Sequence, residues 1–256
     1  MSTPSSITVS AEIRRYEPGQ DAEPRFERFQ VTGLSNMSVL DVVRSIYENQ
    51  AGDLAYQFAC RVGRCGTCAM RVNGRPVLAC QERCKEEMRI EPLTPFPVLR
   101  DLVVDRTEIE GRLAALALSP ERKAGHPGRP EPIDPDLAAT LCNKDSCLLC
   151  MVCVSACPAV DERPFDGPAF MLKLRHMAEH PADHGNRLQQ ALEGGMLECF
   201  NCDVCTQVCP ADLSPAQAIG ASRPGRGMQE RVTDVLPAGA LEINEAAKTA
   251  KAGEEI

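Results

Sequence analysis

Fourteen cysteines stand in this chain of 256 residues, and twelve of them form three regularly spaced runs. The first run has a C-x4-C-x2-C spacing and is closed by a fourth cysteine after eleven more residues: Cys60, Cys65, Cys68 and Cys80. The second and third runs share a C-x2-C-x2-C-x3-C-P spacing and begin 52 residues apart: Cys147, Cys150, Cys153 and Cys157, then Cys199, Cys202, Cys205 and Cys209. Thiols at such fixed spacings are either disulfide partners or metal ligands.

The N-terminal sequence favours metal ligands over disulfides. The opening segment, MSTPSSITVSAEIRRYEPGQ, contains no apolar stretch of the kind that a signal peptide needs. No part of the chain approaches 18 consecutive apolar residues, so we expect no direct membrane span. We therefore expect a cytoplasmic protein, in which thiols stay reduced and available to bind metal.

The spacings also indicate which kind of metal centre the thiols hold. The first run has the spacing of plant-type [2Fe–2S] ferredoxins, and the other two have the bacterial-type [4Fe–4S] spacing. Gly63 and Gly66 permit the positive φ angles that a tight loop around the first cluster requires. Zinc is the alternative metal, but its sites typically show isolated C-x2-C pairs rather than matched four-cysteine runs.

The twelve cysteines divide into three predicted ligand sets. In bacterial-type runs, three cysteines hold one cluster and the fourth crosses to the other cluster. The [2Fe–2S] site comprises Cys60, Cys65, Cys68 and Cys80; site A comprises Cys147, Cys150, Cys153 and Cys209; site B comprises Cys157, Cys199, Cys202 and Cys205. We expect [4Fe–4S] at sites A and B; if Cys202 did not ligate, site B would hold [3Fe–4S] instead.

Other reactive side chains carry no comparable pattern. Cys84 and Cys142 lie outside the runs, and we predict that both are buried structural thiols. His176, His180 and His184 recur every four residues, but Pro181 interrupts that helical spacing, so we expect no metal there. The sequence shows no Ser–His–Asp arrangement, P-loop or dinucleotide fingerprint. We therefore assign no catalytic residue and expect substrate chemistry to take place in another chain.

Periodicity predicts an α+β protein with two domains. Residues 1–105 read as a plant-type ferredoxin domain of the β-grasp kind, with strands over 7–16, 25–31 and 88–93. A helix capped by Ser38 and supported by Asp41 runs to Asn49, and Asn73-Gly74 marks a hairpin.

The second half of the chain reads as mostly helical. Residues 106–136 form a helix over 107–118 and a proline-rich connector. Residues 137–225 form an all-α, bacterial-ferredoxin-like domain with both four-cysteine runs, and residues 226–256 a mobile tail. The helices predicted within that domain cover 169–179, 187–197 and 215–221.

The net charge limits the partners that the chain can bind. The formal charge is −8, whereas phosphate recognition needs basic patches, so we expect no nucleic-acid partner. Only 4% of residues are aromatic and none is Trp, so the cores must be aliphatic.

Five segments in order resemble the iron–sulfur subunit of succinate dehydrogenase and fumarate reductase. They are CRVGRCGTCAMRVNGRPVLAC (60–80), PLTPFPVLRDLVVD (92–105), CLLCMVCVSACP (147–158), GPAFMLKLR (167–175) and CPADLSPAQAI (209–219). The likeness covers roughly residues 5–222. It implies a flavoprotein partner that converts a dicarboxylate on FAD, and an acceptor or membrane-anchor subunit. It also implies a location in the cytoplasm or on the cytoplasmic face of the inner membrane.

Two departures from that family concern the acceptor end. The family usually lacks the second cysteine of the last run, whereas this chain has Cys202 and is therefore expected to build [4Fe–4S] at site B. The family's quinone site uses a Trp soon after the first Cys-Pro and a His after the first cysteine of the last run. Here residues 159–163 are Ala-Val-Asp-Glu-Arg and the His position is Phe200. A quinone at the usual place is therefore not expected.

The resemblance leaves other functions open. The flavoprotein partner could act on succinate or fumarate, or on a different dicarboxylate or succinate analogue. A free-standing multi-cluster ferredoxin and a non-redox protein stapled by clusters are further alternatives. Two predicted domains with three centres favour a fixed electron relay between two docking faces.

Overall fold

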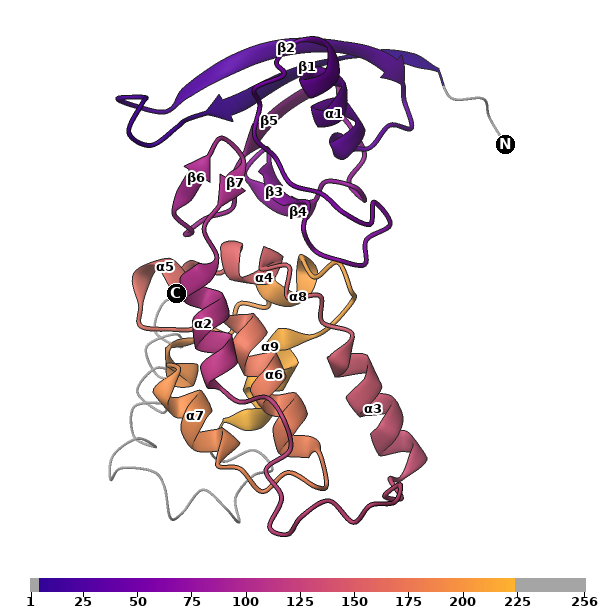
Figure 1. Ribbon diagram of the computed structural model, residues 1–256, viewed down its shortest axis with the longest axis vertical. Helices are drawn as coiled ribbons and strands as arrows, with labels where there is room; N and C mark the ends of the chain where they lie inside the picture. The colour runs from indigo at the N-terminus through magenta and orange to yellow at the C-terminus, as the bar shows by residue number, and fades with distance from the viewer. Residues whose placement is uncertain (1–4, 224–256) are drawn as a thin grey trace, which may run out of the picture.

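The computed structural model describes residues 5–223, which form a sheet-containing part and a helical part stacked end to end (Figure 1). The predicted tail over 226–256 lies outside the described residues. Among residues 5–223, no helix has the length and apolar character needed to cross a bilayer.

The main sheet has five strands in the order β2-β1-β5-β3-β4. The strands are β1 (Ser6–Arg15), β2 (Arg25–Leu34), β3 (Ala69–Val72), β4 (Arg75–Leu78) and β5 (Glu87–Glu91). β1 pairs antiparallel with β2 and parallel with β5. Val9, Ala11 and Ile13 alternate along β1 and are fully buried, as expected for a strand with one face on a core.

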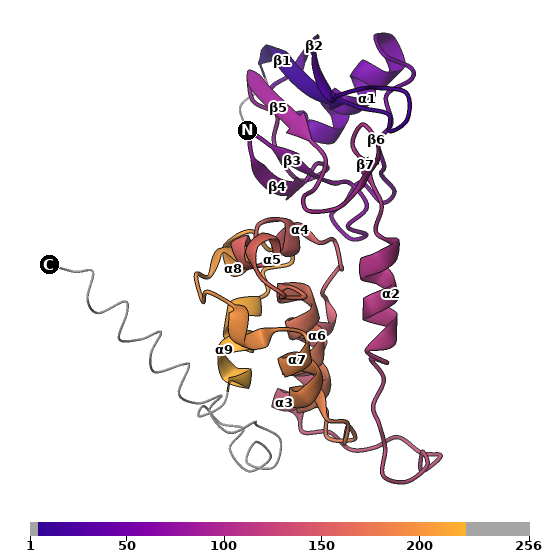
Figure 2. The same cartoon turned by 90° about the vertical axis from the view of Figure 1, so that its left-hand side faces the viewer.

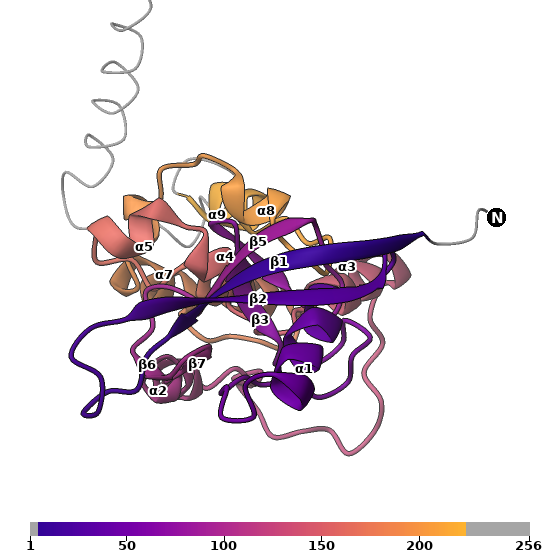
Figure 3. The ribbon, with the colours of Figure 1, turned by 90° about the horizontal axis from the view of Figure 1, so that it is seen from above.

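Helix α1 (Val39–Asn49) covers this core, and its start confirms the predicted cap. The Ser38 hydroxyl accepts a bond from the Asp41 N–H, and the Asp41 carboxylate accepts one from the Ser38 N–H. The predicted hairpin is also confirmed, because β3 and β4 join through Asn73 and Gly74 with φ angles of 50° and 79°. Seen from above (Figure 3), α1 projects to one side of the β1–β2 ribbon, whereas α8 and α9 lie on the other.

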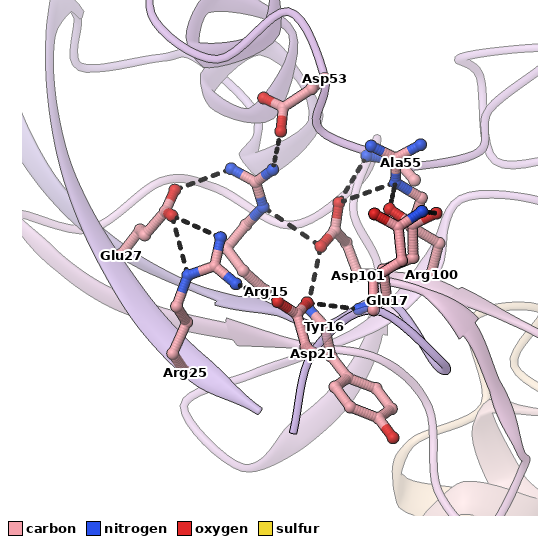
Figure 4. Close-up of polar contacts among 11 residues, drawn as sticks. Arg15, Tyr16, Glu17, Asp21, Arg25, Glu27, Asp53, Ala55, Arg100 and Asp101 are labelled. Carbon is pink, nitrogen blue, oxygen red and sulfur yellow. Dashed lines mark hydrogen bonds and ion pairs between the residues drawn. The ribbon is translucent and has the colours of Figure 1, made fainter. Parts of the chain in front are cut away.

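A second, two-stranded sheet was not predicted. It consists of β6 (Val98–Arg100) and β7 (Val103–Val104), joined through Asp101. The Asp101 carboxylate accepts bonds from the Tyr16 N–H and the Ala55 N–H, both at 2.9 Å, and from Arg15 Nε at 3.1 Å (Figure 4). Asp101 therefore ties the small sheet to β1 and to the segment that leads into the first cysteine loop.

Helix α2 (Thr107–Ala115) begins the connection between the two parts and stands beside the helical part (Figure 2). It ends three residues before the predicted end, since Ala117 takes a φ of 46°, which a helix does not allow. The following segment is held by Arg187, which donates to the carbonyls of Leu116 and Ser119. The Asp183 carboxylate accepts a bond from the Glu121 N–H at 2.9 Å and pairs with Arg187.

The helical part is built around α6. Its helices are α3 (Pro135–Asp145), α4 (Val152–Ser155), α5 (Pro158–Glu162), α6 (Pro168–Glu179), α7 (Arg187–Glu193), η1 (Met196–Glu198), α8 (Val204–Gln207) and α9 (Pro215–Ser222). Helix α3 starts inside the predicted connector, where Asp134 caps it and Pro135 takes the first position. The single helix predicted over 187–197 is wrong: Gly194 and Gly195 end α7, and η1 follows.

Candidate iron–sulfur sites

The [2Fe–2S] site is a loop between α1 and β3 that Cys80 closes from beyond β4. The loop turns through positive φ angles at Arg61, Gly63 and Gly66, of 58°, 71° and 73°, which confirms the conformations predicted for the two glycines. The Arg64 N–H donates to Cys60 Sγ at 3.2 Å, and the Cys60 N–H donates to Cys65 Sγ at 3.5 Å. Backbone amides therefore point at the sulfurs, as a negatively charged cluster requires.

The thiols of this loop have different acidities. Hydrogen bonds from Thr67, together with the Cys60 N–H, lower the pKa of Cys65 to about 6. Burial raises the pKa of Cys68 to about 12; a hydrogen bond from the Cys80 N–H opposes the rise, and the Cys80 thiol contributes to it. A bound iron centre would supply the positive charge that holds all of these groups as thiolates.

Site A brings together cysteines from both bacterial-type runs. Cys147, Cys150, Cys153 and Cys209 line one small pocket. Burial, together with the charges of the neighbouring Cys147 and Cys209, raises the pKa of Cys150 to about 11. Burial also raises the pKa of Cys153, and the charges of Cys150 and Cys147 add to the effect. A thiol from the third run thus lies among three thiols of the second, as crossed ligation predicts.

Site B shows the reciprocal arrangement. Burial raises the pKa of Cys157, and the charges of Cys199 and Cys202 add to the effect. Burial likewise raises the pKa of Cys205 to about 12, with contributions from Cys199 and Cys157. The Asn201 N–H donates to Cys199 Sγ at 3.3 Å. Cys157 of the second run therefore lies among the thiols of the third run.

The two runs repeat the same backbone geometry. Leu149 and Met151 in the second run have φ angles of 50° and 64°. Asn201 and Asp203, 52 residues later, have φ angles of 57° and 63°. Non-glycine residues rarely adopt such angles, so the matched pairs show that both loops fold around their sites in the same way.

The donor groups do not surround a single ion. Within residues 5–223, no three Cys, His, Asp or Glu side chains converge closely enough to hold one metal ion. The three predicted ligand sets consist of thiols alone, which are the ligands that iron–sulfur clusters take, so the residues present fit clusters at these sites. His176 is buried and His184 is exposed, and α6 ends at Glu179 before either His180 or His184.

Of the two cysteines outside the three ligand sets, only one is buried as predicted. Cys84 is buried, as predicted, but the prediction for Cys142 is wrong, because that thiol is exposed on α3. Phe200, which stands at the family's His position, is half-buried beneath the Arg163 guanidinium, 4.4 Å from its ring centre. Met196, which precedes it in the chain, is fully buried in the core.

Sequence reasoning missed two supporting residues. Thr67 sits directly between two predicted ligands and contributes to the low pKa of Cys65, a role that its position could have indicated. Arg106 Nη2 donates to the Leu149 carbonyl at 2.6 Å. This bond attaches the site A loop to the segment that follows the sheet-containing part. No sequence pattern links Arg106 with Leu149, which lies 43 residues away.

Comparison with known proteins agrees with these sites. Residues 10–111 match the family described as a 2Fe-2S iron-sulfur cluster binding domain, and residues 143–213 match the 4Fe-4S dicluster domain. The fumarate reductase iron-sulfur subunit of Escherichia coli O157:H7 is 33% identical over 82% of this chain and 90% of its own length. The corresponding subunit of Haemophilus influenzae is 30% identical over 86% of this chain and 93% of its own.

Two further relatives extend the comparison. One subunit of the fumarate reductase (CoM/CoB) of Methanothermobacter marburgensis is 34% identical over 82% of this chain, which spans only 43% of that protein. A chain in the structure titled "Mycobacterium smegmatis Sdh1 complex in the apo form" superimposes with a TM-score of 0.78 at 26% identity, covering 90% of this chain and 97% of that one. This chain therefore belongs to the family of fumarate reductase and succinate dehydrogenase iron–sulfur subunits, the electron-transfer subunits of multi-subunit oxidoreductases.

Proposed function

We propose that this chain relays electrons between a FAD-bearing flavoprotein subunit and an acceptor subunit, through one [2Fe–2S] and two [4Fe–4S] clusters. The observation that carries the proposal is the exchange of cysteines between the two bacterial-type runs. Cys209 lies with Cys147 and Cys150, and Cys157 lies with Cys199 and Cys202. An iron–sulfur cluster, when bound, takes up or releases one electron at a time without bond making in the substrate.

The ligand assignment follows from these groups. The [2Fe–2S] site would be held by Cys60, Cys65, Cys68 and Cys80; site A by Cys147, Cys150, Cys153 and Cys209; site B by Cys157, Cys199, Cys202 and Cys205. The protein positions the sulfurs, buries five of the twelve cysteines and half-buries six more, and aims N–H groups at several of the sulfurs. These three factors set the reduction potential of a cluster.

We assign the domains in the same terms. Residues 1–105 form a β-grasp ferredoxin domain, which is supported by the mixed five-stranded sheet with α1 packed on it. Residues 106–136 form the connection, and 137–225 the helical domain with sites A and B; the structure supports a start two residues earlier, at α3.

The partners are inferred from the relatives. The flavoprotein would carry out succinate or fumarate chemistry, and the complex would lie in the cytoplasm or on the cytoplasmic face of the inner membrane, with or without an anchor subunit. Cys202 completes site B as a four-thiol site, and Phe200 stands where the family has a His. We therefore propose an acceptor that differs from a quinone bound at the usual place.

Anaerobic purification of the tagged chain from its native host tests this function. We expect a flavin-bearing subunit to purify with it in equal amounts, and the complex to oxidise succinate or reduce fumarate with an artificial electron carrier. A Cys65→Ser variant, which loses one ligand of the first site, is the matched control: it should keep the flavoprotein but lose most of that electron transfer. Recovery of the chain alone, with its clusters intact, would favour a mobile multi-cluster ferredoxin instead.

A further inference from the structure

The loop of the [2Fe–2S] site touches a ligand of site A at one glycine. A Cβ atom built on Gly66 would lie 2.7 Å from the Cβ and 2.9 Å from the Cα of Cys150, and 3.2 Å from the Leu148 carbonyl oxygen. Ordinary contacts of this kind begin at 3.4 Å. Gly66 also has a φ of 73°, so both its conformation and its surroundings exclude a side chain.

This contact lies inside the packed junction of the two parts and not at its rim. Gly66 is buried, and Cys150 is 7% exposed. Cys150 and Val152 belong to the same apolar core as the residues of the main sheet, and Val152 is fully buried there. In both views α4 lies directly against the end of the sheet formed by β3 and β4 (Figures 1 and 2).

Two hydrogen bonds brace the same junction. Arg106 Nη2 donates to the Leu149 carbonyl, beside Cys150, at 2.6 Å. The Thr94 N–H donates to Ser155 Oγ, at the end of α4, at 3.1 Å. Because packed interiors are poorly compressible, a side chain at position 66 has nowhere to go except between the two loops.

We propose that Gly66 is a positioning residue for electron transfer between the [2Fe–2S] site and site A. It allows the backbone of one cluster loop to rest directly on the Cβ of a ligand of the other, so that the two sites are in van der Waals contact. This inference rests on the proposed function. In each transfer, one cluster loses the electron that the other gains, and no proton or bond is exchanged. Because the rate of electron tunnelling falls exponentially with the distance between the two clusters, widening that distance by a few tenths of an ångström slows the transfer.

Gly63 provides a matched control in the same loop. Its φ of 71° is almost that of Gly66, so alanine strains the backbone there to the same degree. The three atoms nearest to a Cβ on Gly63 would all belong to the side chain of Gln81, at 3.0 to 3.3 Å. That side chain is flexible and can move away, so Gly63→Ala leaves the contact with Cys150 intact.

The test compares Gly66→Ala and Gly63→Ala in the complex with the flavoprotein. Iron and sulfide contents establish that the clusters are present. Electron paramagnetic resonance then measures how much the reduced, paramagnetic site A speeds the spin relaxation of the reduced [2Fe–2S] cluster, and freeze-quench samples follow transfer between them. We expect weaker relaxation enhancement and slower transfer in Gly66→Ala than in Gly63→Ala, because both variants strain the loop but only the first puts a methyl group against Cys150. Equal changes in the two variants would contradict this. Wild-type relaxation and transfer in a fully loaded Gly66→Ala complex would overturn the proposal.

A second variant covers the case in which Gly66→Ala does not retain its cluster. Arg106→Met removes the bond to the Leu149 carbonyl without adding bulk to either loop. We expect it to keep all clusters and to show weakened relaxation enhancement, because the site A loop loses one of its attachments to the sheet-containing part. Unchanged relaxation in Arg106→Met would overturn the proposal when Gly66→Ala loses its cluster. Failure of the wild-type chain to bind a flavoprotein or three clusters would instead refute the proposed function.

Discussion

Replacing Arg15 with methionine removes a cation that pairs with three carboxylate side chains in the sheet-containing part (Figure 4). Arg15 forms ion pairs with Glu27 at 2.7 Å, Asp53 at 2.5 Å and Asp101 at 3.1 Å. The side chains of Arg15 and Asp101 are only 5% and 4% exposed. Methionine keeps the unbranched apolar stem of arginine and lacks the guanidinium group, so the change chiefly tests the charge and its hydrogen bonds.

Breaking a buried pair by removing one partner costs about 3–5 kcal/mol. Asp101 keeps its two backbone N–H donors, from Tyr16 and Ala55, so we expect the lower end, about 3 kcal/mol. At about 2–4 °C per kcal/mol for a chain of this size, the midpoint of thermal unfolding should fall by about 6–12 °C.

The assay is thermal unfolding followed by circular dichroism under anaerobic conditions. Asp53→Asn is the control, because the Asp53 side chain is 63% exposed and an exposed pair contributes about 1 kcal/mol or less. Its midpoint should fall by no more than about 2–4 °C. The reasoning is wrong if Arg15→Met lowers the midpoint no further than Asp53→Asn does.

Three further changes test other parts of the account. Cys202→Ser should leave site B with one iron fewer, giving a [3Fe–4S] cluster that is paramagnetic when oxidised; an unchanged iron content would show that Cys202 is not a ligand. Burial alone would raise the pKa of Asp183, but hydrogen bonds from Arg187 and the Glu121 N–H lower it below its ordinary value. The stability from this pair is therefore present above the unfolded pKa of about 3.9 and lost as pH falls through the folded value. Urea midpoints measured against pH should show that loss in the wild type and not in Asp183→Asn. Removing iron with a chelator should abolish hydrogen-exchange protection in α8 and α9 while β1 and β2 stay protected, because metal binding contributes folding free energy to the helical part; equal loss in both parts would contradict this.

The features that could be predicted best from the sequence are those formed by residues close together along the chain. The cap of α1 needs only Ser38 and Asp41, which lie three residues apart. The turn between β3 and β4 needs only Asn73-Gly74, and the cysteine loops need only their own spacing. In each case the interacting groups lie within a few residues, so the pattern alone specifies the geometry.

Features that depend on distant segments were missed. β6 and β7 are too short to show a period, and they form where Asp101 meets Arg15 and Ala55 from far earlier in the chain. Cys142 was expected to be buried because thiols usually are, but it lies on the outer face of α3. The apolar pattern over 187–197 hid the break at Gly195, whose φ is 76°.

The same distinction applies to the sites. The ligand sets of sites A and B stay a prediction from the cysteine spacing, which in bacterial-type runs specifies a crossing fourth ligand. The contact between Gly66 and Cys150 was not predictable, because it depends on how the two parts pack together. The bond from Arg106 to Leu149 was missed for the same reason.

Mössbauer spectroscopy of the anaerobically purified, iron-enriched chain, combined with iron and sulfide analysis, tests most directly whether twelve cysteines hold three clusters. The account predicts the signals of one [2Fe–2S] and two [4Fe–4S] clusters in each chain, with no bound zinc. Zinc in place of iron, or a single kind of cluster, would contradict it.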